Sequence, residues 1–128
     1  MKLVIAAMAL ALTVGCVDGL TGASVDGEKA FMEDCAGCHG ADAKGNGPMG
    51  EILLKSPPDL THLSANNAGV FPRDYVMSTI DGMARAPHFS AAMPEFGAGD
   101  MGPIVNVEGT PIPARLLALA GYLESIQE

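Results

Sequence analysis

The segment Cys35-Ala36-Gly37-Cys38-His39 contains the side chains of this chain that are best suited to chemistry. Two thiols separated by two residues, with an imidazole directly after the second thiol, have the spacing at which a c-type haem is attached. Each thiol can add to one vinyl group of the same macrocycle, and the imidazole that follows can ligate the iron. The motif therefore predicts one covalently bound haem c, held by Cys35 and Cys38, with His39 as an axial iron ligand.

Other sites that use a Cys-x-x-Cys pair fit this sequence less well. Iron–sulfur clusters and structural zinc sites need further soft ligands, and the only other cysteine in the sequence is Cys16. A thioredoxin-like redox pair would lie in a βαβ unit, and the sequence shows no such pattern. Haem attachment is thus favoured over metal clusters and over dithiol chemistry.

A second iron ligand is expected, and methionine is the main candidate. Four of the eight methionines belong to predicted helices or to the N-terminal segment, and Met49 follows Pro48 and is expected on the same side as His39. This leaves Met83, Met93 and Met101 in predicted loops. Only Met93 is followed directly by a proline, which would stiffen the backbone beside a ligand. A thioether ligand raises the reduction potential relative to ligation by two histidines. The alternative ligand is His88, which would give bis-His iron.

Three helices are predicted to position these residues. The first begins after an N-cap at Asp26 and carries the haem motif to a stop at Gly40. The second starts with Pro72 and ends at Gly82, and the third begins near Pro113 with an apolar period of 3.6 residues. Sixteen glycines and nine prolines place much of the other backbone in loops. This pattern predicts an all-α domain that wraps around a prosthetic group.

The N-terminal residues have the composition of an export signal. One lysine precedes an apolar run that is too short to span a bilayer, and residues 13–16 resemble the cleavage motif of a bacterial lipoprotein. We expect residues 1–15 to be a signal peptide of lipoprotein type, 16–25 a linker and 26–128 one domain. Lipidation of Cys16 would anchor the protein to the periplasmic side of a bacterial membrane. The alternative is ordinary cleavage, which would leave a soluble periplasmic protein.

The chain is acidic, with 15 Asp and Glu residues against seven Lys and Arg residues and a formal net charge of −8. Such a balance effectively excludes nucleic-acid binding. It favours electrostatic steering toward a redox protein that carries a basic docking patch. A solvated acidic surface without any role in recognition is the alternative interpretation.

The sequence from residue 26 to residue 128 resembles that of small class I bacterial c-type cytochromes. Gly27 and Phe31 on the first predicted helix, and Leu119 and Tyr122 on the last, match the residues at which two helices cross in that family. The glycine would permit a close approach of the helices, and contact between the aromatic rings would fix their angle. The resemblance implies the cytochrome c fold, with short helices and long loops around one haem.

The resemblance also implies roles for two loops. Gly47-Pro48 resembles the turn whose proline carbonyl accepts a hydrogen bond from the ligand imidazole, which would orient His39; an ordinary loop is the alternative. Met93-Pro94, followed closely by Phe96, resembles the distal-ligand loop. Residues 98–112 form either a small β excursion or a tolerated insertion. Candidate donors for the haem propionates are Lys55, Asn66, Asn67, Arg73, Tyr75 and Arg85.

Two functions are compatible with such a haem. Iron with both axial positions filled leaves no place for a substrate, so we expect a monomeric one-electron carrier between membrane or periplasmic redox proteins, and not an enzyme. The alternative is the haem subunit of a larger oxidoreductase, or a redox or gas sensor in which Met93 is a labile ligand. The sequence contains no second Cys-x-x-Cys-His motif and no phosphate-binding loop that would demand catalysis.

Overall fold

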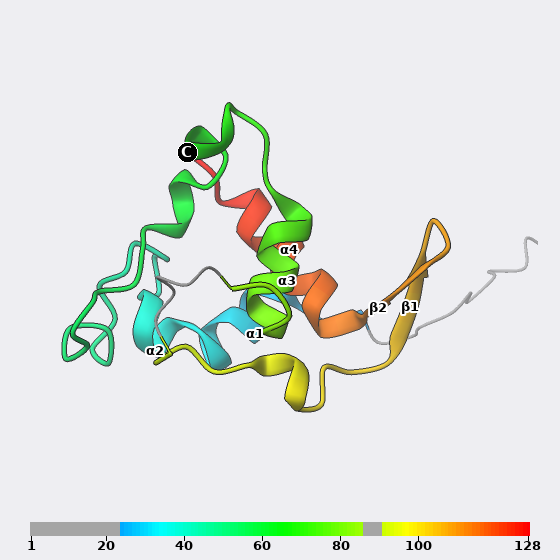
Figure 1. Cartoon of the computed structure of the whole chain (residues 1–128), viewed down its shortest axis with the longest axis horizontal. Helices are drawn as coiled ribbons and strands as arrows, with labels where there is room; N and C mark the ends of the chain where they lie inside the picture. Colours follow the sequence, from blue (N-terminus) through cyan, green and yellow to red (C-terminus); the bar gives the residue numbers. More distant parts are fainter. Residues whose placement is uncertain (1–23, 86–90) are drawn as a thin grey trace, which may run out of the picture.

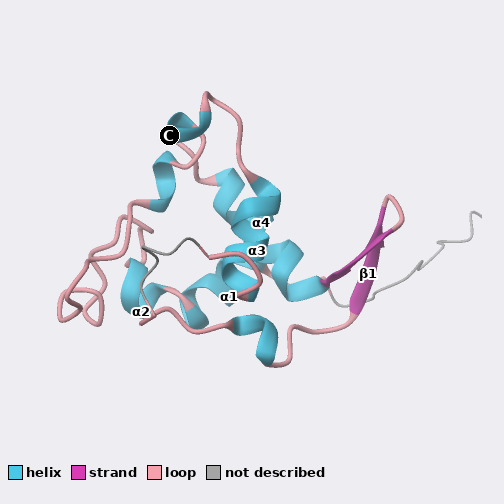
Figure 2. Ribbon diagram, in the orientation of Figure 1, coloured by secondary structure: helices cyan, strands magenta, loops and turns pink. Residues whose placement is uncertain are grey.

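The computed structural model describes residues 24–85 and 91–128. Within these ranges the chain forms four α-helices, three short 3₁₀ helices and one two-stranded hairpin (Figures 1 and 2). The expected signal peptide, Cys16 and His88 lie outside the described residues. None of the helices in the described ranges is both long and apolar enough to cross a membrane.

The first predicted helix is divided into two in the structure. Helix α1 (Gly27–Asp34) begins at Asp26, whose side chain accepts a hydrogen bond of 3.0 Å from the backbone N–H of Lys29. Helix α2 (Ala36–His39) follows after a break at Cys35 and ends at Gly40, where φ is +82°. The predicted start and stop are therefore confirmed, but the haem motif occupies a turn of its own at an angle to α1 (Figure 1).

The two other predicted helices are present with nearly the expected limits. Helix α3 (Arg73–Asp81) is preceded by Pro72, which takes the N-cap position, and ends at Gly82 with φ of +99°. Helix α4 (Ala114–Ser125) follows directly after Pro113. The 3₁₀ helices are η1 (Leu60–His62), η2 (Ala65–Asn67) and η3 (Phe96–Ala98).

The chain forms a β-hairpin between the loop that contains Met93 and helix α4. Strands β1 (Ile104–Val107) and β2 (Thr110–Pro113) pair in antiparallel register, with Val105 opposite Ile112. The hairpin extends away from the helices (Figures 1 and 2). The structure thus favours the β excursion of the two possibilities for this segment, and the domain itself is built from helices.

The core forms where α1 crosses α4. A Cβ atom added to Gly27 would lie 2.2 Å from the carbonyl oxygen of Ala118, so the two backbones touch at this point. Phe31 is fully buried, and its ring centroid lies 5.3 Å from that of Tyr122 at an angle of 43°. Leu119 is 1% exposed beside them. The predicted crossing is therefore confirmed, and α3 adds Val76, Ile80 and Met77 to the same core.

Candidate functional site

A cavity of about 400 Å³ lies beside the haem motif and is lined by Cys35, Cys38 and His39. Met93, from the loop before η3, lines the same cavity. The volume is in the range of small-molecule and cofactor sites, about 300–1,000 Å³. The structure therefore brings together four of the residues that were predicted from the sequence. Apolar and aromatic groups complete the wall, among them Leu53, Pro57, Pro58, Tyr75 and Phe96.

The other loop methionines lie elsewhere. The side chain of Met83 is 84% exposed, and Met101 is only 7% exposed because it packs in the core. Neither lines the cavity. Of the three methionines that the sequence places in loops, Met93 is thus the one with access to the site.

His39 is held as a neutral imidazole. Burial lowers its pKa, and the backbone carbonyl of Pro58 offsets this in part. The Nδ1 atom of His39 is buried and makes no hydrogen bond within the described ranges. Neutral imidazole is the form that ligates iron, so the environment of His39 suits this role.

The loop of residues 45–50 supports α2 through its backbone. The N–H of Gly45 donates to the carbonyl of His39 at 2.7 Å, and the N–H of Met49 donates to that of Gly37 at 2.9 Å. A Cβ atom on Gly47 would lie 2.6 Å from the Gly37 oxygen, so a larger residue would push the loop away. These bonds satisfy carbonyl groups that a helix end leaves without partners, and they fix the turn that carries His39.

The predicted hydrogen bond from His39 to the Pro48 carbonyl stays a prediction. Pro48 belongs to the loop that supports α2 and does not line the cavity, whereas Pro58 does. The Pro58 carbonyl also partly offsets the lowering of the His39 pKa by burial. Sequence reasoning did not single out Pro58 as a residue beside the imidazole.

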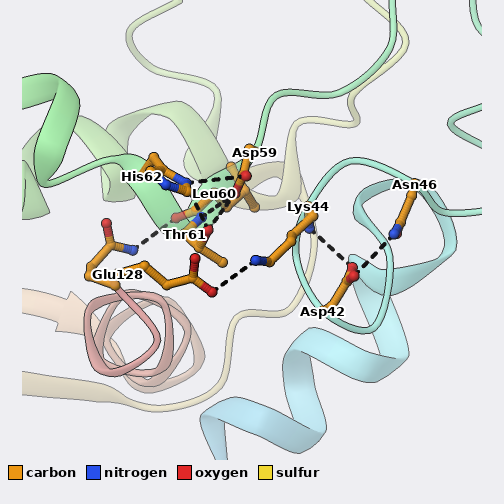
Figure 3. Close-up of polar contacts among 9 residues, drawn as sticks. Asp42, Lys44, Asn46, Asp59, Leu60, Thr61, His62 and Glu128 are labelled. Atoms are coloured by element: carbon orange, nitrogen blue, oxygen red, sulfur yellow. Dashed lines mark hydrogen bonds and ion pairs between the residues drawn. The ribbon is translucent and has the colours of Figure 1, made fainter.

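Polar contacts brace the segment that contains Pro58 (Figure 3). The Asp59 carboxylate accepts hydrogen bonds from the Thr61 hydroxyl at 2.6 Å and from the Thr61 N–H at 2.8 Å. These bonds lower the pKa of Asp59, the hydroxyl contributing most. In addition, the N–H of Leu60 donates to the carbonyl of Ala43 at 2.8 Å. The direction of the backbone after Pro58 is thus fixed on both sides.

Residues after α4 complete this bracing. The side chain of Gln127 accepts from the N–H of Ser64 and donates to the carbonyl of Leu60, each at 2.8 Å. The N–H of Glu128 donates to the carbonyl of Thr61 at 2.9 Å, and its carboxylate pairs with Lys44 at 2.9 Å (Figure 3). The loop beside His39 is therefore held in place by residues far away in the sequence.

The two motif cysteines, Cys35 and Cys38, are half-buried and are not joined in a disulfide. Burial raises the pKa of Cys35 to about 12, and the charge of Asp34 adds to this, while Arg115 acts in the opposite direction. Arg115 also forms an ion pair of 2.6 Å with Asp34, which joins α4 to the end of α1.

No group of three or more His, Cys, Asp or Glu side chains that could hold a metal ion occurs in the described part of the chain. The donor set at the cavity is instead two thiols, one neutral imidazole and one thioether. This set matches a haem that is attached through thioether bonds and ligated through the imidazole, and it matches neither a zinc site nor an iron–sulfur cluster.

Some of the candidate donors for the haem propionates line the cavity, and others are paired elsewhere. Lys55 and Tyr75 line the cavity. Arg73 instead forms an ion pair with Glu124 on α4, and the Asn67 side chain donates to a backbone carbonyl of its own loop at 2.8 Å. Lys55 and Tyr75 are therefore the better placed of these donors.

Comparison with known families agrees with the donor set. The family model described as cytochrome c matches residues 24–106, a span that includes the motif, Pro58 and Met93. The chain belongs to the cytochrome c family. Members of this family contain covalently bound haem c and are generally electron carriers and not enzymes. Comparisons of this cytochrome with curated proteins and with solved structures gave no match.

The fold agrees with this assignment and extends it. The family match ends within β1, so α4 lies beyond it. The contact of α4 with α1 through Gly27 and Tyr122 nevertheless closes the mostly helical domain in the way expected for a cytochrome c fold.

Proposed function

We propose that this cytochrome holds a single haem c with His39 and Met93 as axial ligands and carries single electrons between redox proteins. The observation that supports it best is that Met93 lines the same cavity as Cys35, Cys38 and His39, although it lies in a distant part of the sequence. When bound, the haem supplies a one-electron ferric–ferrous couple. The protein supplies attachment, axial ligands and an apolar surrounding.

Each of these residues has a separate task. The thiols of Cys35 and Cys38 fix the group permanently, so that it cannot be lost to the medium. Burial keeps the imidazole of His39 unprotonated, and its backbone supports hold the ring in one place. The thioether of Met93 is soft and neutral, which favours the ferrous state. Pro57 and Phe96 line the wall and reduce the access of water.

Transfer of electrons needs only a small and transient contact with a partner. The acidic composition supports a partner with a basic docking patch, whose attraction would weaken as salt rises. The composition of residues 1–16 supports export to the periplasmic side of a bacterial membrane and lipidation at Cys16. Class I membership and a monomeric state are part of the same proposal.

Absorption spectroscopy of the oxidised protein tests the ligand assignment. Ferric haem with a sulfur ligand has a weak far-red band, which we expect in the wild-type protein. The band should disappear in Met93→Leu, and the reduction potential should fall in Met93→His, because a second imidazole stabilises ferric iron. Met83→Leu is the matched control, since Met83 is exposed and does not line the cavity.

The alternatives predict other results. If His88 were the ligand, the wild-type protein would lack the far-red band, and its spectrum would change in His88→Ala but not in Met93→Leu. Rapid binding of carbon monoxide by the reduced wild-type protein would favour a sensor. A stable complex with a catalytic subunit at high salt would favour a role as a subunit of a larger oxidoreductase.

A further inference from the structure

Arg85 lies just after α3, and its guanidinium group contacts the backbone of residues 91–95, the described part of the loop before η3 that we call the methionine loop. Nη1 donates to the carbonyl of Met93 at 2.7 Å, and Nη2 donates to the carbonyl of Pro94 at 2.5 Å. Nε donates to the carbonyl of Thr79, in the last turn of α3, at 3.2 Å. The planar fork of one side chain therefore joins the end of α3 to the two residues at which the ligand is expected.

The segment after Met93 also lies close against the end of α3. A Cβ atom on Gly97 would lie 2.0 Å from a carboxylate oxygen of Asp81, and one on Gly82 would lie 2.7 Å from Cγ of Glu95. There is no room for a larger residue at either glycine without movement of the chain. The loop is thus supported after Met93 by close packing, and at Met93 and Pro94 by Arg85.

We propose that Arg85 is the positioning residue for Met93, and that it keeps the thioether in the cavity against competing ligands. The inference rests on the proposed ligation of iron by Met93. It differs from a role in propionate binding, because Arg85 donates to the carbonyls of Met93 and Pro94 and is not among the residues that line the cavity.

The physical reason lies in how a thioether leaves iron. An external ligand needs the space that the Met93 side chain fills, and movement of the loop that carries Met93 opens this space. Movement of the loop breaks the two bonds from Arg85 to Met93 and Pro94. These bonds are charge-assisted, and the planar guanidinium group makes both at once, so they resist opening of the loop.

Removal of Arg85 should therefore increase the fraction of open loop. Imidazole is a suitable probe, because it binds to ferric iron only after the thioether has left. We expect Arg85→Leu to bind imidazole about 10- to 100-fold more tightly than the wild-type protein, as estimated from the loss of two charge-assisted bonds that water replaces in part. Arg85→Lys keeps the charge but not the fork, and should lie between the two.

The experiment is a titration of the ferric holoprotein with imidazole, followed by the main haem absorption band in every variant and also by loss of the far-red band in the variants that keep Met93. Arg73→Leu is the matched control, because it removes the same charge from the start of α3, where Arg73 pairs with Glu124 and has no bond to the described residues of the methionine loop. We expect its imidazole affinity to equal that of the wild type. The pair Met93→Ala and Met93→Ala/Arg85→Leu should bind imidazole equally, because Arg85 acts only through Met93.

Three results would overturn the inference. Equal affinities of Arg85→Leu and wild type, in a wild-type protein that shows the far-red band, would refute the role of Arg85 and leave Met93 ligation intact. An effect of Arg85→Leu that persists in the Met93→Ala background would show that Arg85 acts on the cavity in another way. Absence of the band in the wild-type protein would refute the proposed ligand, and the inference with it. If Arg85→Leu does not fold, the comparison of Arg85→Lys with wild type decides.

Discussion

Replacement of Gly27 by alanine probes the crossing of α1 and α4, on which the whole domain depends. The added Cβ atom would lie 2.2 Å from the oxygen and 2.9 Å from the carbonyl carbon of Ala118, and 3.0 Å from Cβ of Tyr122. Two of these three atoms belong to helix backbone and the third is bonded to it, so rotation of a side chain cannot relieve the contact. The helices must separate by about 1 Å, which also loosens the contact of Phe31 with Tyr122.

The cost can be worked out from these contacts. Overpacking of a tight interface costs about 1–3 kcal/mol, and partial loss of an aromatic pair adds up to about 1 kcal/mol. The higher helix propensity of alanine returns less than about 1 kcal/mol, because Gly27 is the first residue of α1. We therefore expect Gly27→Ala to lower the free energy of unfolding by about 2–3 kcal/mol.

The assay is guanidinium denaturation of the holoprotein, followed by both far-ultraviolet circular dichroism and haem absorption. Gly121→Ala is the control on α4, where an added Cβ atom meets nothing within 4 Å. This variant should be as stable as the wild type or more stable by up to about 1 kcal/mol, since it improves helix propensity alone. The reasoning is refuted if Gly27→Ala matches or exceeds the stability of the wild type.

Three further expectations concern other parts of the molecule. Gln127→Ala removes three hydrogen bonds and should lower the free energy of unfolding by about 1–3 kcal/mol in the same denaturation assay; an unchanged midpoint would contradict the role given to this side chain. The pKa of Asp59 is lowered from 3.8, so the stability it contributes is complete above that pH and is lost as the pH falls through the lowered value. The free energy of unfolding should therefore decrease less steeply at acid pH in Asp59→Ala than in the wild-type protein. An equal decrease in both proteins would contradict this contribution of Asp59. Ile104→Ser, at a side chain that is 62% exposed on the hairpin, should change stability by less than about 0.5 kcal/mol, and a larger loss would mean that the hairpin packs more tightly than the structure indicates.

Features that depend on neighbouring residues were predictable from the sequence. The cap at Asp26 and the stop at Gly82 use side chains and backbone angles within one helical turn, and both were predicted correctly. The crossing of α1 and α4 was also predicted, because Gly27 and Tyr122 match the residues at which two helices cross in the family that the sequence resembles. The haem motif itself is local, and its spacing alone indicates the chemistry.

Features that depend on distant parts of the chain were not predictable. The break at Cys35 arises where the backbone changes direction between α1 and α2, and no proline or glycine marks it. The place of Pro58 in the cavity wall depends on how a loop folds back toward α2. The bonds of Arg85 exist only because the methionine loop returns to the end of α3, so sequence analysis did not distinguish this arginine from the other candidate propionate donors.

The bracing of the Pro58 segment by Gln127 and Glu128 has a consequence for how the protein is made. Chains are synthesised from the N-terminus, so Cys35 and Cys38 leave the ribosome well before α4 does. At that stage neither the helix crossing nor the support beside His39 exists. On a chain that has no core yet the two thiols are accessible, and the enclosed site forms only when the last helix arrives.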